Sequence, residues 1–180
     1  MERLYLKMAH ASVVGLTLLL TVLAFVAFAY FDQARPPGTA GVVALQLAFS
    51  AEAFQSIVKQ WGASGVQAYR VSTLYVDSWF PIVYASLLAS LIALLTHKLG
   101  KAFDKVTLFF TLPFVATLLD WVENALHLIL LRNPDRFSPM LVLVASLAAA
   151  IKWGIIGFSA LLVLYFLAQR IGARLLRRQA

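Results

Sequence analysis

Four long apolar runs, separated by polar connections, dominate the chain. A helix that crosses a hydrocarbon core of about 30 Å needs about 20 mostly apolar residues, and each run is long enough to meet that requirement. The pattern therefore predicts four transmembrane helices, over residues 8–30, 74–96, 106–131 and 139–168.

The long first connection contains a shorter amphipathic pattern. Its large apolar residues recur at helical spacing and are Phe54, Ile57, Val58 and Trp61. Ser50 precedes them and can cap a helix, and Gly62 follows them and can end it. We therefore expect a short helix over residues 50–61, with its apolar stripe on the membrane surface or over the mouth of the bundle.

The composition of the chain is typical of a protein that lies within a lipid bilayer. Hydrophobic residues make up 62% of the sequence, charged residues 13%, and the mean hydropathy is +0.84. These values exclude a disordered chain. The predicted fold is an all-α integral membrane protein with one membrane domain over residues 1–180. It is a four-transmembrane-helix bundle with a short amphipathic interfacial helix in the first outer connection.

The basic residues that give the chain its net charge of +7 are unevenly distributed between the two predicted sides of the membrane. Nine of the fifteen basic residues lie before the first run, between the second and third, or after the fourth. By the positive-inside rule, both termini are expected in the cytoplasm, most simply at a bacterial inner membrane. We expect anionic lipid heads as partners of these residues, and no nucleic acid, because no basic stripe alternates with aromatic residues. The absence of cysteine excludes disulfides and thiolate chemistry.

The runs also contain polar residues that would be costly in lipid. They are Asp77, Tyr84, Asp120, Glu123, Asn124, His127 and Lys152. Four of them stand at i, i+3, i+4 and i+7 on the third run, which places them on one helix face. A charge at the bilayer centre costs about 3 kcal/mol or more, so these side chains are expected to face the bundle interior, in the outer half of the membrane.

Three carboxyls against one ammonium leave an excess of acid. A low-dielectric site does not hold that excess without help from a protonated carboxylic acid, a protonated His127, a bound cation, or water and a polar ligand. Each of these solutions corresponds to a different function.

The interpretation that we develop is a pocket that binds or converts a lipophilic substrate, such as a lipid or an isoprenoid, by proton transfer. The candidate catalytic residues are Asp120, Glu123, Lys152 and Asp77. The candidate ligand-binding residues are Asn124, His127, Tyr84, Trp121 and Trp153. No cofactor and no metal are expected, and the partners expected are membrane lipids, a lipophilic small molecule, and a second copy or a larger membrane complex.

Several alternatives stay open at this point. In a purely structural interpretation, Lys152 pairs with Asp120 or Glu123, and Asp77 caps the second helix. The acidic stripe could instead conduct protons or cations, or Glu123 and His127 could share a metal. A Schiff base on Lys152 and a non-enzymatic accessory subunit are further possibilities. The sequence contains no P-loop, GxGxxG, HExxH or GxSxG motif that would decide between them.

Overall fold

The chain is helical, and the computed structural model describes residues 1–133 and 138–179. Three of its helices are long and apolar enough to cross a membrane. They are α2 (Ala11–Asp32), α5 (Phe80–Lys98) and Pro139–Leu176 of α7 (Pro139–Gln179). The sequence-based prediction of an all-helical chain with apolar, membrane-length helices is therefore confirmed for the described residues.

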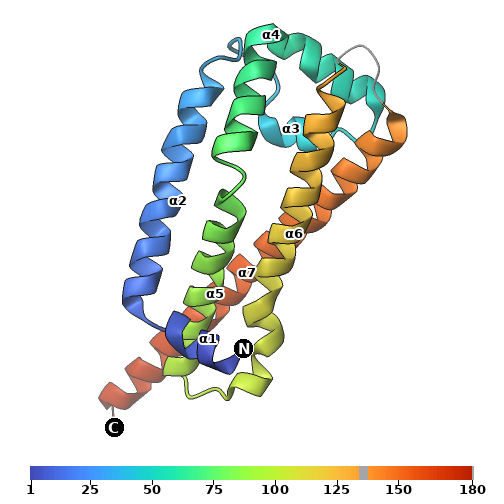
Figure 1. The fold of residues 1–180 in the computed structure, drawn as a ribbon. Coiled ribbons are helices and arrows are strands. Elements are labelled where there is room, and N and C mark those ends of the chain that lie inside the picture. The colour runs from blue at the N-terminus through green and yellow to red at the C-terminus, as the bar shows by residue number, and fades with distance from the viewer. Residues whose placement is uncertain (134–137, 180) are drawn as a thin grey trace.

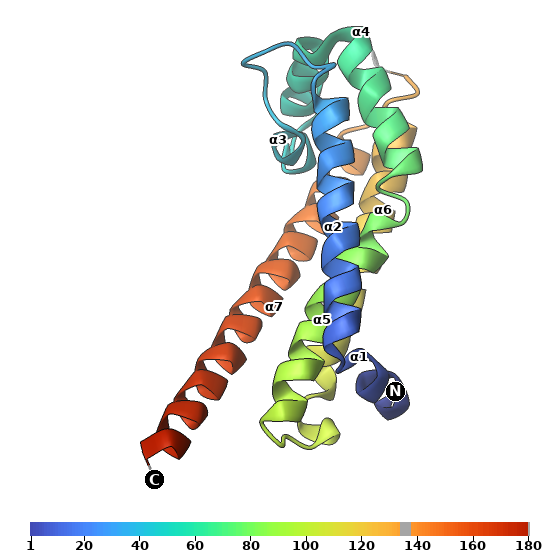
Figure 2. The same ribbon diagram turned by 90° about the vertical axis from the view of Figure 1, so that its left-hand side faces the viewer.

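The long helices run alongside one another between two ends of the molecule (Figure 1). α6 (Thr107–Leu130) packs mainly against α7 and α5, and α2 packs mainly against α5. The short α3 (Val42–Gln46) and the first part of α4 (Ala51–Tyr75) lie at the upper end. The N-terminus and the C-terminal end of α7 lie toward the lower end (Figures 1 and 2).

The lower end is closed by α1 (Glu2–Met8) and the 3-10 helix η1 (Phe103–Lys105). Tyr5 is buried there, and its hydroxyl lies 3.0 Å from Thr96 Oγ1. Its ring packs on those of Phe103 and Phe110, with centroids 5.2 and 5.6 Å apart. These contacts fix the chain segments that precede α2 and α6.

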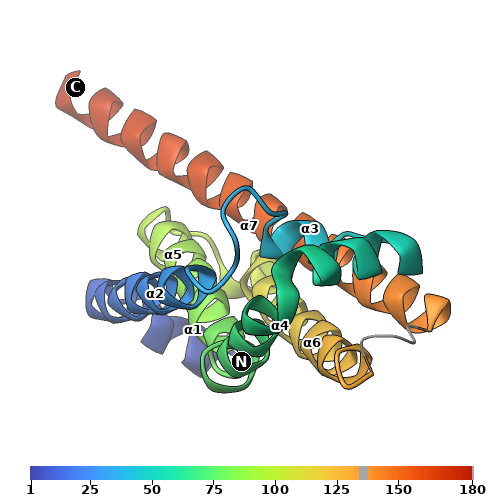
Figure 3. The same ribbon diagram turned by 90° about the horizontal axis from the view of Figure 1, so that it is seen from above.

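The upper end is covered by the amphipathic helix that the sequence predicts. Ser50 caps α4 by accepting a hydrogen bond from Ala53 N at 3.1 Å, and the helix breaks at Gly62, which has φ +64° and ψ −175°. The buried stripe packs over the upper ends of α6 and α7, in one cluster with Leu130 and Val142. The stripe is therefore buried against α6 and α7, and the view from above shows the first part of α4 lying across their upper ends (Figure 3).

The second apolar run is organised differently from the prediction. After Gly62, α4 continues to Tyr75, and α5 begins at Phe80 instead of Leu74. Pro81 stands in the first turn of α5, where the missing N–H costs nothing and the fixed φ favours helix initiation. Residues 76–79 therefore interrupt the helical path beside the middle of the bundle.

The last helix is longer than expected. α7 extends to Gln179 and contains 41 residues, which corresponds to about 60 Å at 1.5 Å per residue. It inclines away from α2 and α5 toward its C-terminal end (Figure 2). Its upper half is the part that packs against α3 and α4 and contributes to the site described below.

Candidate functional site

The polar stripe of α6 faces the inside of the bundle, as its spacing predicts. Asp120, Glu123, Asn124 and His127 are all buried, and so is Thr117 one turn lower. Thr117 donates a hydrogen bond to the carbonyl oxygen of Pro81 at 2.9 Å. This bond holds α6 against the first turn of α5.

Lys152 reaches this stripe from α7 and contacts both acids. Its Nζ lies 3.0 Å from Asp120 Oδ1 and 2.5 Å from Glu123 Oε2, and all three side chains are at most 5% exposed. Tyr84 of α5 donates a hydrogen bond to the other oxygen of Asp120 at 3.0 Å. Asp120 is therefore held from two helices, and the ion pair joins α6 to α7.

Glu123 is less well satisfied than Asp120. Its Oε1 lies 3.8 Å from His127 Nδ1 and has no hydrogen-bond partner within the described part of the chain. His127 Nδ1 lies 2.8 Å from the hydroxyl of Tyr69 on α4, and its Nε2 is buried without a described partner. We call this connected set, with its six members, the charged network. Its members are Tyr84, Asp120, Lys152, Glu123, His127 and Tyr69.

Asp77 lies in the break between α4 and α5 and does not cap a helix. The residue in the cap position of α5 is Trp79, and no side chain caps that helix. The backbone carbonyl of Asp77 accepts a hydrogen bond from Asn124 Nδ2 at 3.4 Å. Within residues 1–133 and 138–176, no basic nitrogen lies within 4.0 Å of the Asp77 carboxylate, so it has no ion-pair partner there.

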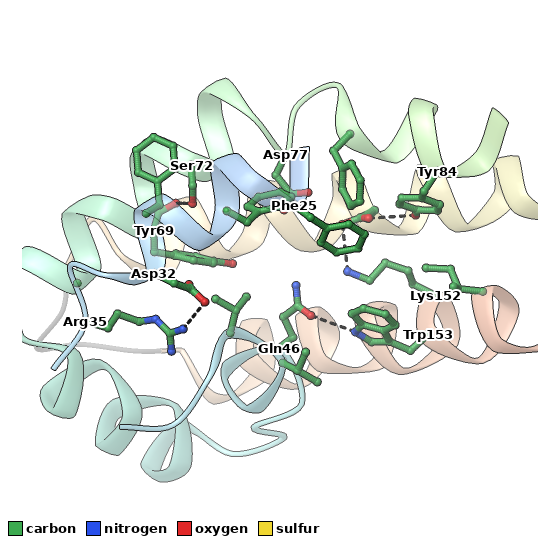
Figure 4. A pocket seen from close by; sticks show the side chains of 18 residues that line it. Phe25, Asp32, Arg35, Gln46, Tyr69, Ser72, Asp77, Tyr84, Lys152 and Trp153 are labelled. Atoms are coloured by element: carbon green, nitrogen blue, oxygen red, sulfur yellow. Dashed lines mark hydrogen bonds and ion pairs between the residues drawn. The ribbon is translucent and has the colours of Figure 1, made fainter. Parts of the chain in front are cut away.

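A pocket of about 350 Å³ lies beside the charged network (Figure 4). Asp77, Tyr84, Asp120 and Lys152 are among the residues that line it. The rest of the lining is mostly apolar or aromatic and comprises Phe25, Phe28, Phe31, Val42, Val43, Gly65, Tyr69, Ser72, Phe80, Trp153 and Ile156, together with the polar residues Asp32, Arg35 and Gln46. Six helices, α2 to α7, contribute to the whole lining, which encloses a mostly apolar space with some polar groups, a typical ligand-pocket composition.

The upper rim of the pocket has its own ion pair. Arg35 Nη2 lies 2.7 Å from Asp32 Oδ2, and Arg35 Nη1 donates a hydrogen bond to the carbonyl oxygen of Ala40 at 2.8 Å. Gln46 of α3 also lines the pocket and accepts a hydrogen bond from Trp153 Nε1 at 3.0 Å. The rim is therefore held in place by neighbouring protein groups.

The predicted site residues divide into three groups. Those that line the pocket are Asp77, Tyr84, Asp120, Lys152 and Trp153. Glu123, Asn124 and His127 are buried behind this wall. Trp121 is 39% exposed and donates a hydrogen bond to the carbonyl oxygen of Ser78 at 2.9 Å, so it does not line the pocket.

Other residues of the site were not singled out from the sequence. Tyr69 and Gln46 lie in the long first connection, which has no transmembrane pattern. Phe25, Phe28 and Phe31 recur every three residues on the first apolar run, and that spacing is the signal that could have marked an aromatic face toward a pocket. Among the described residues, no group of three or more His, Cys, Asp or Glu side chains is arranged to hold a metal ion.

Helical bundles host many unrelated functions, so this architecture alone assigns none. No protein-family model, curated protein or solved structure matches the chain. The function is therefore inferred from the pocket and from the charged network behind it.

Proposed function

We propose that α2, α5, α6 and α7 cross a membrane as a four-helix bundle and that the pocket between them binds a lipophilic molecule. α6 contains 24 residues, about 36 Å of helix, which is enough to cross a hydrocarbon core of about 30 Å. Its polar face is covered by α5 and α7, which supports a place inside a membrane bundle. With both termini in the cytoplasm, the pocket lies in the outer half of the bilayer.

One observation carries this proposal: buried charged side chains line an apolar cavity. Asp120 and Lys152 contact each other and also form part of the pocket wall. A buried ion pair is a weak source of stability compared with apolar packing, so stability alone does not explain its position in the wall of a cavity. A lipophilic ligand would bury its tail against the phenylalanines and be oriented by the polar wall.

The wall also contains the groups that proton-transfer chemistry needs. A carboxylic acid or carboxylate at Asp77 or Asp120 can give or accept a proton, and the Lys152 ammonium can stabilise negative charge that develops on a substrate. Tyr84 donates its hydroxyl hydrogen to Asp120, which positions that carboxylate and leaves the hydroxyl oxygen as an acceptor at the wall. The reaction class that fits is isomerisation, cyclisation or hydrolysis of a lipid or an isoprenoid.

Conduction of protons or cations has weaker support. A conducting path needs polar groups over the full membrane thickness, and the members of the charged network on α6 all lie beyond Thr117, in one half of that helix. Below it, the hydroxyls of Thr17, Thr21 and Ser90 donate hydrogen bonds to carbonyl oxygens of their own helices. Because these hydroxyls donate to the backbone, their hydrogens are not available for a chain of hydrogen bonds that would carry protons from one side chain to the next.

The proposal is tested by identifying what the purified protein carries. Native mass spectrometry of gently solubilised protein, followed by analysis of the released molecules, should find a lipophilic compound in stoichiometric amount. Ile156→Trp fills the pocket without changing a charge and should abolish this retention. Leu161→Trp is the matched control, because Leu161 lies on the same helix, is 65% exposed and does not line the pocket.

Two other results would contradict the proposal. Protein that carries no lipophilic compound, or one that Ile156→Trp retains as well as Leu161→Trp does, would show that the pocket is not a binding site. A partner protein in place of a small molecule would favour an accessory subunit of a larger membrane complex. Once a ligand is identified, conversion by the wild type and not by Asp120→Asn would establish catalysis.

A further inference from the structure

Asp77 differs from the other acids of the pocket because no described basic side chain forms an ion pair with it. Asp32 is paired with Arg35 at 2.7 Å, and Asp120 is paired with Lys152 at 3.0 Å. Asp77 lines the same pocket without an ion-pair partner among the described side chains (Figure 4). Its partner is therefore to be sought in the pocket itself.

The described cations around the pocket are already engaged. Lys152 is shared by two carboxylates, Asp120 and Glu123. Arg35 is held by Asp32 and by the Ala40 carbonyl oxygen. An ionised Asp77 in these mostly apolar surroundings is costly without a counter-ion, so a positively charged ligand group is the kind that would stabilise its charged form.

The aromatic part of the pocket favours the same kind of group. Phe80 stands one turn after Asp77, and its ring packs against Phe25 and Phe28 with centroids 5.6 and 5.3 Å apart. All three rings line the pocket. Aromatic ring faces attract ammonium groups, and clusters of such rings recognise quaternary ammonium ligands.

We propose that the ligand of this pocket is a lipophilic ammonium compound, with its cationic head against Asp77 and its apolar tail along the phenylalanines. This inference rests on the proposed function, because it names the chemical class of the molecule that the pocket takes. An anionic ligand would be repelled by the Asp77 carboxylate, and a neutral ligand would leave that carboxylate without a counter-ion. The ammonium can belong to a free amphiphilic amine or to a membrane lipid with an amine headgroup, which share this chemistry.

The test compares three probes with similar tails: decyltrimethylammonium, decanol and decanoate. Binding to the full-length protein is measured by native mass spectrometry from dodecyl maltoside, a detergent without an ammonium group. Wild-type protein should bind decyltrimethylammonium at least about tenfold more tightly than decanol, and decanoate most weakly. Asp77→Asn should remove this preference while decanol binding persists. Asp104→Asn should keep it, because Asp104 is exposed in η1 and distant from the pocket lining.

The outcomes separate this inference from the proposed function. Equal binding of decyltrimethylammonium and decanol, or a preference for decanoate, would overturn the ammonium inference and leave a lipophilic pocket. Failure of all three probes to bind, or equal binding to Ile156→Trp, would overturn the pocket itself. If Asp77→Asn does not fold, the wild-type ranking and Asp77→Glu, which keeps the charge, decide the question.

A second measurement identifies the source of the ammonium. Wild-type protein and Asp77→Asn are purified from mixed vesicles of phosphatidylethanolamine and phosphatidylglycerol, and the retained lipids are quantified. Enrichment of phosphatidylethanolamine that depends on Asp77 would identify a lipid headgroup as the ligand. No enrichment, together with selective binding of decyltrimethylammonium, would identify a free amphiphilic amine. Enrichment of phosphatidylglycerol through Asp77 would contradict the inference.

Discussion

Replacing Lys152 with methionine is the sharpest test of the charged network. Methionine keeps the apolar stem and removes the ammonium, so Asp120 and Glu123 lose their shared cation. The two carboxylates are 5% and 0% exposed, so water does not replace it. Removing one partner of a buried pair costs about 3–5 kcal/mol, a large part of a typical free energy of unfolding of about 5–15 kcal/mol.

The loss of the ammonium should destabilise the two carboxylates to different extents. Asp120 keeps the hydrogen bond from Tyr84, whereas Glu123 keeps only His127 at 3.8 Å. Neutralising Glu123 should therefore recover more stability than neutralising Asp120. We expect Lys152→Met to be the least stable variant, Lys152→Met/Asp120→Asn to be intermediate, and Lys152→Met/Glu123→Gln to be the most stable of the three.

The assay is unfolding in mixed detergent micelles, followed by far-ultraviolet circular dichroism. Lys59→Met is the matched control, because Lys59 is exposed on α4 and makes no described ion pair. Its unfolding free energy should stay within about 0.5 kcal/mol of the wild type. Equal stability of Lys152→Met and Lys59→Met would refute the buried network. Better rescue by the Asp120 substitution than by the Glu123 substitution would refute the unequal roles assigned to the two acids.

Three other predictions use the same chain. Tyr84→Phe removes a buried donor from its carboxylate acceptor and should cost about 1–3 kcal/mol in the unfolding assay; an unchanged stability would contradict the hydrogen bond. Gly62→Ala forces a side chain onto a backbone with φ +64° and should cost about 1–3 kcal/mol, whereas Gly154→Ala, within a helix with open space around it, should not destabilise; equal effects would argue against the break in α4. The chain has no cysteine, so Lys59→Cys and Lys98→Cys each carry a single exposed thiol. An impermeant maleimide should label the first in intact cells and the second only after permeabilisation, and the reverse pattern would invert the topology.

The helices and the polar face of α6 were predictable because they follow from local periodicity. Apolar runs of membrane length mark helices whatever their neighbours are. Asp120 and Glu123, three residues apart, lie on one face of any helix, and Lys152 is the cation within the apolar runs that can neutralise them. The pairing of Lys152 with both acids and of Tyr84 with Asp120 agrees with that expectation.

The second half of α4 was not predictable, because tertiary contacts hold it. Residues 63–75 include Gly65 and several β-branched residues, which favour helix weakly. In the fold, Arg35 approaches Gly65 so closely that a Cβ there would lie 3.1 Å from Arg35 Cγ. Farther along, Tyr69 reaches His127, 58 residues away in the chain. Neither contact can be recognised from the local sequence pattern, so the part of the pocket wall formed by the second half of α4 was not predicted.

The two walls of the pocket are held by different forces, and this has a consequence for specificity. Lys152, Asp120 and Tyr84 are fixed by directional bonds that join α5, α6 and α7. Within the described part of the chain, the side chains of α2 make hydrogen bonds to their own helix and an ion pair with Arg35, and none to the helices that carry the network. α2 therefore forms its wall by apolar contact, which fixes no single geometry, whereas polar networks are sensitive to small displacements. We expect the pocket to tolerate changes in the tail of a ligand far better than changes in its head, so that specificity resides in the polar wall.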